Sequence, residues 1–236
     1  MKSNRSVGVD GCRRGWLCVF REGQGLNYRI AESIDELTAL YPSETIAIDV
    51  PIGLPDAGPR SVDVLARRRL QGRRSSVFPA PIRPILRATD RATASDISEA
   101  VDGRRISAQA WAIVPKIVEV DLVLQRTPAL RHRVHECHPE VCWAGMNDDT
   151  PMQFGKKRQS GRRERLALVE RYFGRPGCNL YEEIGAQHRR CDVALDDVLD
   201  ALACLWTAER IASGQAIHLL PEQEMDSLGI PMQMAC

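Results

Sequence analysis

The order of strand-like segments near the start of the chain most restricts its fold. Residues 5–10, 16–20 and 26–31 are typical of strands and are separated by glycine-containing turns, which predicts two consecutive hairpins. A capping-box pattern at 33–36 predicts a short helix to about Tyr41, and the apolar run 45–50 predicts a buried strand. A doubly wound fold alternates strands and helices from its first strand. We therefore expect an α/β fold with a five-stranded mixed sheet, its first three strands antiparallel, and helices on both faces.

The remainder of the chain alternates helical and strand patterns. The stretch from about 51 to 105 is rich in proline and arginine, contains a helical pattern at 61–71, and is interpreted as an insertion. Helices are predicted at 106–125, 161–173 and 195–213, with Gly174 and Gly214 as stops, and a strand is predicted at 133–137. The length of 236 residues favours one large domain carrying that insertion.

Composition excludes several classes of protein. No run approaches 18 apolar residues, so a membrane span is not expected, and no apolar signal-peptide core follows Met1. We therefore expect a cytoplasmic protein whose eight cysteines are reduced and lack the spacing of a zinc motif. The net charge of +1 excludes a uniformly basic nucleic-acid-coating protein but permits a local basic face.

Four aspartates stand where strands end or a helix begins. Asp10 ends the first predicted strand, Asp49 ends the buried one, and Asp197 and Asp200 share a face at the start of the last helix. Such acids are usually turn or capping residues, but Asp49 follows a run that predicts burial. A cluster of carboxylates repels itself, and a hard divalent cation is the simplest compensation. Two such ions about 3.5–4 Å apart can hydrolyse a phosphodiester.

Three motifs, at 7–11, 46–54 and 197–202, together resemble the RNase H-like superfamily. The last is similar to the Asp-x-x-Asp-Ala-Leu helix of RuvC-type Holliday-junction resolvases. With Arg60, Asp63, Arg67 and the segments 75–81 and 136–140, the chain resembles, over its full length, a bacterial and archaeal family of predicted RNase H-like nucleases of this branch.

The resemblance implies a single RNase H-like domain over residues 1–236, with the insertion at about 51–105. It also implies Mg²⁺ or Mn²⁺ held by Asp10, Asp49 and Asp197, with Asp200 as a further ligand, and all four aspartates are catalytic candidates. Two departures matter. The second acid of RuvC-type enzymes is commonly Glu, where this chain has Asp49, and the insertion has no counterpart in a minimal RuvC-type core. Resolvase activity is therefore not carried over.

The insertion supplies the candidate substrate-binding residues. Nine arginines and two acids lie between Arg60 and Arg91, which indicates either a phosphate-binding face or a solvated helix surface. Arg60, Asp63 and Arg67 have the spacing of an ion-pair ladder, whereas the serines near Phe78 fit a pocket for a small phosphorylated ligand. The substrate-binding candidates are Arg13, Arg60, Arg67, Arg74, Ser75, Ser76, His138 and Lys156.

A further pair of candidates follows the strand predicted at 133–137. Alternation along a strand places Glu136 and His138 on one face. Either residue is a candidate general base or additional metal ligand, and Glu136 is included among the catalytic candidates. A buried histidine with a purely structural role is an equally good interpretation.

Three hypotheses about function remain open. The first is a metal-dependent nuclease or phosphodiesterase acting on nucleic acid or a phosphorylated small molecule. The second is a nucleotide- or sugar-phosphate-binding enzyme related to the actin-like ATPases, in which the loop 11–15 cradles phosphate, although no glycine-rich adenosine motif follows residue 195. The third is a non-catalytic RNase H-like interaction module. A homodimer is compatible with all three.

Overall fold

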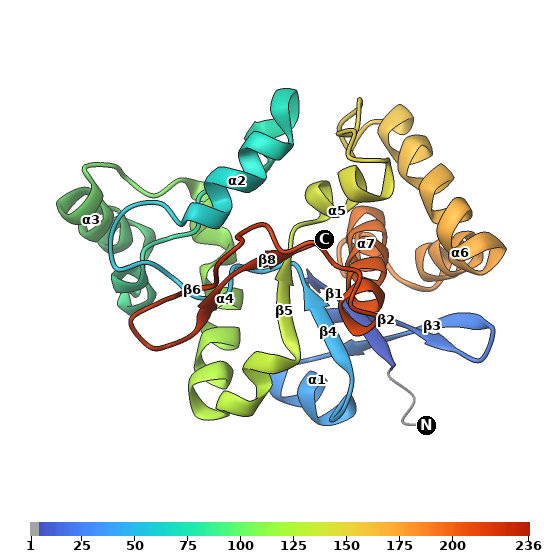
Figure 1. The fold of residues 1–236 in the computed structure, drawn as a ribbon, viewed down its shortest axis with the longest axis horizontal. Coiled ribbons are helices and arrows are strands. Elements are labelled where there is room, and N and C mark those ends of the chain that lie inside the picture. Colours follow the sequence, from blue (N-terminus) through green and yellow to red (C-terminus); the bar gives the residue numbers. More distant parts are fainter. Residues whose placement is uncertain (1–4) are drawn as a thin grey trace.

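A six-stranded mixed sheet lies at the centre of the molecule, which the computed structural model describes over residues 5–236 (Figure 1). The strands β1 (Ser6–Cys12), β2 (Gly15–Glu22) and β3 (Gly25–Ala31) form the predicted antiparallel meander. β4 (Thr45–Ile48), β5 (Val134–Cys137) and β8 (Met234–Ala235) add in parallel, which gives the order β3-β2-β1-β4-β5-β8.

The predicted strand count of five was therefore wrong by one. β8 is two residues long and too short to give a periodic signal in the sequence. It follows a small hairpin of β6 (Glu224–Met225) and β7 (Pro231–Met232), which was also not predicted. The C-terminal tail therefore contains three short strands, of which β8 pairs with β5 and β6 pairs with β7.

Helices cover both faces of the sheet. On one face α7 (Leu195–Ala212) lies against β1, with α5 (Pro139–Met146) and α6 (Gln159–Gln187) beside it. The approach of α7 to β1 is close, since a Cβ atom on Gly8 would lie 2.0 Å from the backbone nitrogen of Leu205. The opposite face packs against α1 (Ile34–Leu40) and α4 (Ala108–Arg126).

The predicted helices are present, and one of them is longer than predicted. Ser33 caps α1 by accepting a hydrogen bond from the Glu36 backbone N–H at 3.2 Å. Gly174 does interrupt α6, with φ 64° and ψ −158°, but the chain then resumes a helical path to Gln187, which was not predicted. The turn expected at 11–15 is tighter, because Cys12 pairs with Gly15 and only two residues connect the strands.

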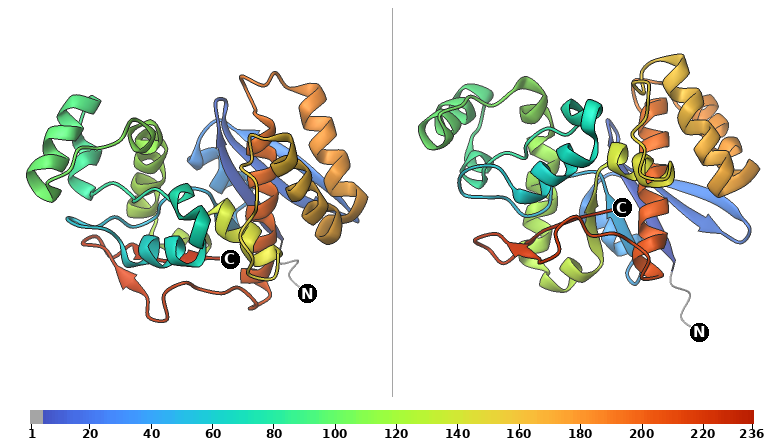
Figure 2. Two further views of the ribbon diagram at one scale, coloured as in Figure 1. Left: turned by 90° about the horizontal axis from the view of Figure 1, so that it is seen from above. Right: turned by 45° about the horizontal axis from the view of Figure 1, so that its top comes forward.

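The proline- and arginine-rich segment forms α2 (Ser61–Arg69), two 3₁₀ turns, η1 (Gln71–Ser76) and η2 (Arg83–Arg87), and the unpredicted helix α3 (Arg91–Asp102). A third 3₁₀ turn, η3 (Pro128–His132), precedes β5. This segment and α6 lie on opposite sides of the carboxyl ends of the central strands in the views of Figure 2. Within residues 5–236, no helix has the length and apolar character needed to cross a lipid bilayer.

Candidate metal centre

Three aspartates meet at the carboxyl edge of the sheet, beneath α7. β1 and β4 are parallel neighbours with Val9 opposite Ile48, so the next residues, Asp10 and Asp49, lie side by side. Alternation turns both carboxylates toward the α7 face, where Asp200 occupies the second turn of the helix. One oxygen from each of these residues, the Asp cluster, lies within 4.8 Å of the others.

The Asp cluster has few hydrogen-bond donors. Asp10 Oδ1 accepts from the Gly11 backbone N–H at 2.7 Å, and Asp200 Oδ2 contacts the Lys156 ammonium. The other oxygen of Asp200 is buried and has no partner within residues 5–236. A buried carboxylate oxygen without a donor is costly unless a cation binds it.

The pKa values of the Asp cluster also indicate a shortage of positive charge around it. Burial, followed by the charges of Asp49 and Asp200, raises the pKa of Asp10 well above its usual value. Burial and the neighbouring Asp200 raise the pKa of Asp49 to about 7. For Lys156, desolvation acts to lower the pKa, but Asp200 and Asp10 outweigh it and raise the pKa. One ammonium therefore faces three carboxylates, and the cluster lacks positive charge.

The donor set fits a divalent metal ion. All three groups are carboxylates, and hard cations such as Mg²⁺, Mn²⁺ or Ca²⁺ prefer oxygen ligands. The unpartnered Asp200 oxygen supplies a coordination position that no protein donor uses. The Asp cluster can therefore bind a divalent metal ion, and its chemistry does not distinguish among these ions.

Asp197 is not part of the Asp cluster, although the resemblance implied that it would be a ligand. Its Oδ2 accepts a hydrogen bond from the Ala194 backbone N–H at 2.9 Å, which makes it a cap of α7. Burial raises the pKa of Asp197 to about 6 despite this bond. Asp200, three residues further along α7, lies beside Asp10 and Asp49 instead.

Glu136 and Arg60 face away from the Asp cluster and pair with each other. The two guanidinium nitrogens of Arg60 donate to both oxygens of Glu136 at 2.7 Å, and Nη2 also donates to Asp63 at 2.6 Å. Arg60 is 2% exposed. The proposed roles of Glu136 in catalysis and of Arg60 in substrate binding are thus not supported, because every charged group of this Arg60 network is committed internally.

His138 does not share the environment of Glu136, contrary to the predicted alternation. β5 ends at Cys137, and His138 turns toward the Asp cluster as the residue before α5. Its Nδ1 is buried without a partner within residues 5–236, and burial lowers the pKa of the imidazole. A neutral ring with a free nitrogen therefore lies beside the carboxylates.

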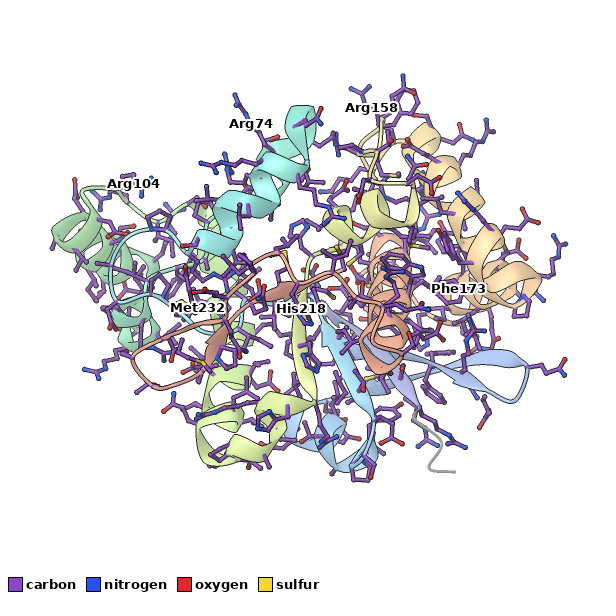
Figure 3. All side chains as sticks on the ribbon, viewed as in Figure 1. Arg74, Arg104, Arg158, Phe173, His218 and Met232 are labelled. Atoms are coloured by element: carbon purple, nitrogen blue, oxygen red, sulfur yellow. The ribbon has the colours of Figure 1, made fainter. Side chains whose placement is uncertain are left out.

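The other predicted substrate contacts are distributed unevenly. Ser76 and Lys156 lie beside the Asp cluster, whereas Arg67 is held by the Val77 carbonyl at 2.6 Å. Arg74 projects from the upper edge of the molecule, as Figure 3 shows, and belongs with Arg67 to a separate surface hollow. Arg13 and Ser75 are exposed and do not line the site, although Cys12 and Ser76 beside them do.

A cleft of about 780 Å³ opens above the Asp cluster, and we call it the acidic cleft. Its walls come from η1 and the residues after it, from α4, and from the loop that precedes α6. Several lining residues were not selected as site candidates from the sequence, although Glu140 lies in the segment 136–140 and Arg73 is one of the nine arginines of the insertion. They are Trp16, Arg73, Ile113, Lys116, Glu140, Lys157 and Arg158.

Two of these residues illustrate how the walls are built. Lys116 Nζ donates to the Gly15 carbonyl at 2.7 Å and lies 4.1 Å from the centre of the Trp16 ring, so β2 and α4 are joined at the rim. Glu140 accepts from Arg165 at 2.6 Å through Oε1, while its Oε2 is buried without a hydrogen-bond partner within residues 5–236. The floor thus offers a further carboxylate oxygen.

Comparison with known proteins gives one match. A family model described as "Protein of unknown function (DUF429)" matches residues 8–225, which include all three members of the Asp cluster. Neither the search of curated proteins nor that of solved structures found a match.

Proposed function

The chain belongs to the DUF429 family, and we propose that it is a metal-dependent phosphodiesterase with an RNase H-like fold. In this proposal the whole chain is one domain, and the segment at about 51–105 is an insertion that forms one wall of the acidic cleft. The strand order β3-β2-β1-β4-β5, with an antiparallel meander followed by parallel strands, supports the fold that the sequence resemblance implies. β8 is then an addition at one edge.

The observation that carries the proposed activity is the Asp cluster itself. Three carboxylates from β1, the end of β4 and α7 converge within 4.8 Å, and one buried oxygen of Asp200 has no protein donor within the described chain. Protein cores seldom hold such a group without compensation. The cluster also opens into a cleft with basic residues on its walls, which is where an anionic phosphodiester would bind.

Asp10, Asp49 and Asp200 would hold Mg²⁺ or Mn²⁺. A bound ion of this kind polarises a phosphoryl oxygen and lowers the pKa of water. These carboxylates would hold the ion at the floor of the cleft, and Arg73, Lys157 and Arg158, which line the same cleft, would attract the phosphate by charge. His138 offers an unpartnered Nδ1 that can accept a proton at the site.

Calorimetric titration with Mn²⁺ tests the metal site directly. We expect saturable binding by the wild-type chain and none by Asp10→Asn/Asp49→Asn. The control is Asp96→Asn, since this carboxylate is 73% exposed and lies on α3. Wild-type protein that binds no Mn²⁺, or a double variant that binds as well as wild type, would contradict the proposal.

Hydrolysis is then measured separately. The wild type with Mn²⁺ or Mg²⁺ is incubated with single-stranded and structured nucleic acids and with bis(p-nitrophenyl) phosphate. We expect cleavage that requires the added metal and disappears in Asp10→Asn. Metal binding without hydrolysis of any phosphodiester would leave the metal site intact and refute the enzymatic part of the proposal.

A further inference from the structure

The acidic cleft contains apolar side chains that face solvent. Phe78, just after η1, is 45% exposed, and Ile113, on α4, is 38% exposed. Both line the cleft, together with Trp16 and Pro51. Leu122 on the same helix is also exposed, at 53%, but does not line it. The cleft therefore presents an apolar surface next to the carboxylates, which phosphate binding alone does not require.

Positive charges stand at the mouth of the same cleft. Lys157 and Arg158 are exposed, and neither forms an ion pair within residues 5–236. Figure 3 shows Arg158 at the upper edge of the molecule, beside the loop that precedes α6. Across the cleft, Arg73 has a buried Nε without a hydrogen-bond partner, and its Nη2 lies 3.9 Å from Glu140. Lys157 and Arg158 are therefore available to an anionic ligand, whereas Arg73 is already paired with Glu140.

Together these features match the two chemical parts of a nucleotide. An apolar, aromatic wall suits the face of a base, and base–aromatic stacking tolerates any sequence. Unpaired cations suit the phosphates on either side. The cleft volume of about 780 Å³ lies within the range of pockets that enclose a small ligand. A base inside a duplex is already stacked and paired, so its face is not accessible to Phe78.

We propose that the acidic cleft binds an unpaired nucleotide of a nucleic-acid strand. Its base lies against Phe78 and Ile113, its scissile phosphate at the Asp cluster, and a neighbouring phosphate at Lys157 and Arg158. This inference rests on the proposed phosphodiesterase function and narrows its substrate to single-stranded or locally unpaired nucleic acid.

Fluorescence anisotropy tests the inference on the full chain carrying Asp10→Asn, so that bound strands are not cleaved. The probes are a short labelled single strand, made as DNA and as RNA, its duplex, and an abasic strand with the same phosphates. We expect the single strand to bind at least about tenfold more tightly than the duplex or the abasic strand. Equal or tighter binding of the duplex would overturn the inference.

Variants locate the base. Phe78→Ala and Ile113→Ala, added separately, should each weaken binding of the single strand at least about fivefold and leave the abasic strand unchanged. Leu122→Ala, on the same helix but outside the cleft, should change neither. Circular dichroism checks that each variant is folded. If Phe78→Ala does not fold, Ile113→Ala provides the test. Variants that affect both strands equally, or neither, would contradict base stacking.

A second pair of variants locates the phosphate. Arg158→Gln should weaken binding of the normal and abasic strands alike. Arg104→Gln, near α3 at the left edge of Figure 3, should weaken neither. A free mononucleotide carries the same base and phosphate groups, so its binding to the acidic cleft is measured as well. If it binds as tightly as the strand, the ligand is a nucleotide and not nucleic acid, and the inference fails.

The inference and the proposed function fail differently. Base-dependent binding of single strands without metal-dependent hydrolysis would support the nucleotide-binding inference and refute the proposed phosphodiesterase activity. Metal-dependent hydrolysis that prefers duplex substrates would support the phosphodiesterase activity and refute the inference that the cleft binds an unpaired nucleotide.

Discussion

Two clusters of acidic residues, one around β1, β4 and α7 and the other between β5 and α2, have opposite character. In the Arg60 network, the guanidinium pairs with Asp63 and Glu136, and the backbone N–H groups of Ile52 and Ala80 donate to these acids at 2.6 and 2.8 Å. In the Asp cluster, three carboxylates share one ammonium and one backbone N–H. The first cluster is saturated with donors, and the second has an unpartnered oxygen facing a cleft.

The comparison shows that burial alone does not identify a functional acid. Glu136 is 3% exposed and Asp10 is 8% exposed, and burial raises the pKa of both. Arg60 opposes that shift for Glu136, whereas the other aspartates increase it for Asp10. Compensation inside the fold indicates a structural role, and missing compensation beside a cleft indicates a ligand.

The largest expected effect comes from breaking the Arg60 network. Arg60→Met leaves Asp63 and Glu136 buried without their cation, and we expect a loss of about 3–5 kcal/mol in the free energy of unfolding. Urea unfolding measures it, with Arg67→Met on the same helix as the control. A variant as stable as wild type would show that the network contributes little.

The Asp cluster should respond with the opposite sign. Asp49→Asn removes one of three mutually repelling carboxylates, so the metal-free protein should gain roughly 1–2 kcal/mol of stability while Mn²⁺ binding is lost. Thermal unfolding in EDTA and calorimetry measure the two effects on one sample. A destabilised metal-free variant would mean that Asp49 is a structural acid like Asp63.

Lys156 should compete with a metal ion. Its ammonium contacts Asp200, and its Nζ lies 3.9 Å from Asp196. Lys156→Met should tighten Mn²⁺ binding about tenfold, because a positive charge near the ion is removed. The control is Lys157→Met, measured by the same calorimetry. Because the Lys157 side chain is exposed, its removal should change Mn²⁺ binding less. Weaker binding in the Lys156 variant would contradict simple competition.

The pH dependence follows from Asp49. Its pKa is raised from 3.8 to about 7 in the folded chain, so between these values the folded state holds a proton that the unfolded state has released. Stability of the metal-free protein should therefore fall as pH rises from about 4 to about 7.

Urea unfolding in EDTA across this range measures the slope, and Asp49→Asn should reduce it, while Asp10 and Asp197, whose pKa values are also raised, still contribute slopes of the same sign. His135, whose pKa burial lowers to about 4, contributes a slope of the opposite sign. Subtracting the variant from wild type isolates the contribution of Asp49. A difference that rises with pH would contradict the assignment.

The smallest effect is expected at Arg74. This side chain is exposed and belongs to neither cluster. Arg74→Ala should change the free energy of unfolding by less than about 0.5 kcal/mol and leave Mn²⁺ binding unchanged. Loss of metal binding in this variant would mean that the two clusters do not account for the site.

Local patterns predicted most of the central elements. The three-strand meander, the capped helix α1, the buried strand β4 and the last helix α7 each carry a complete signal within a few residues. The second half of α6 and the strand β8 were missed. Gly174 is a typical signal for the end of a helix, so the helical turns after it were not predicted, and a two-residue strand is too short to show periodicity.

The sequence by itself predicted that Asp10 and Asp49 lie toward the carboxyl ends of two strands and that acids begin the last helix, whereas the pairing of those strands is a property of the tertiary structure. Only the tertiary structure decided which acids form the site, since Asp197 and Asp200 differ by less than one helical turn and carry the same local signal. It also separated Glu136 from His138 and enclosed Arg60. The physical reason is that compensation of a buried charge depends on partners distant in the chain, such as Arg60 for Glu136 and Lys156 for Asp200.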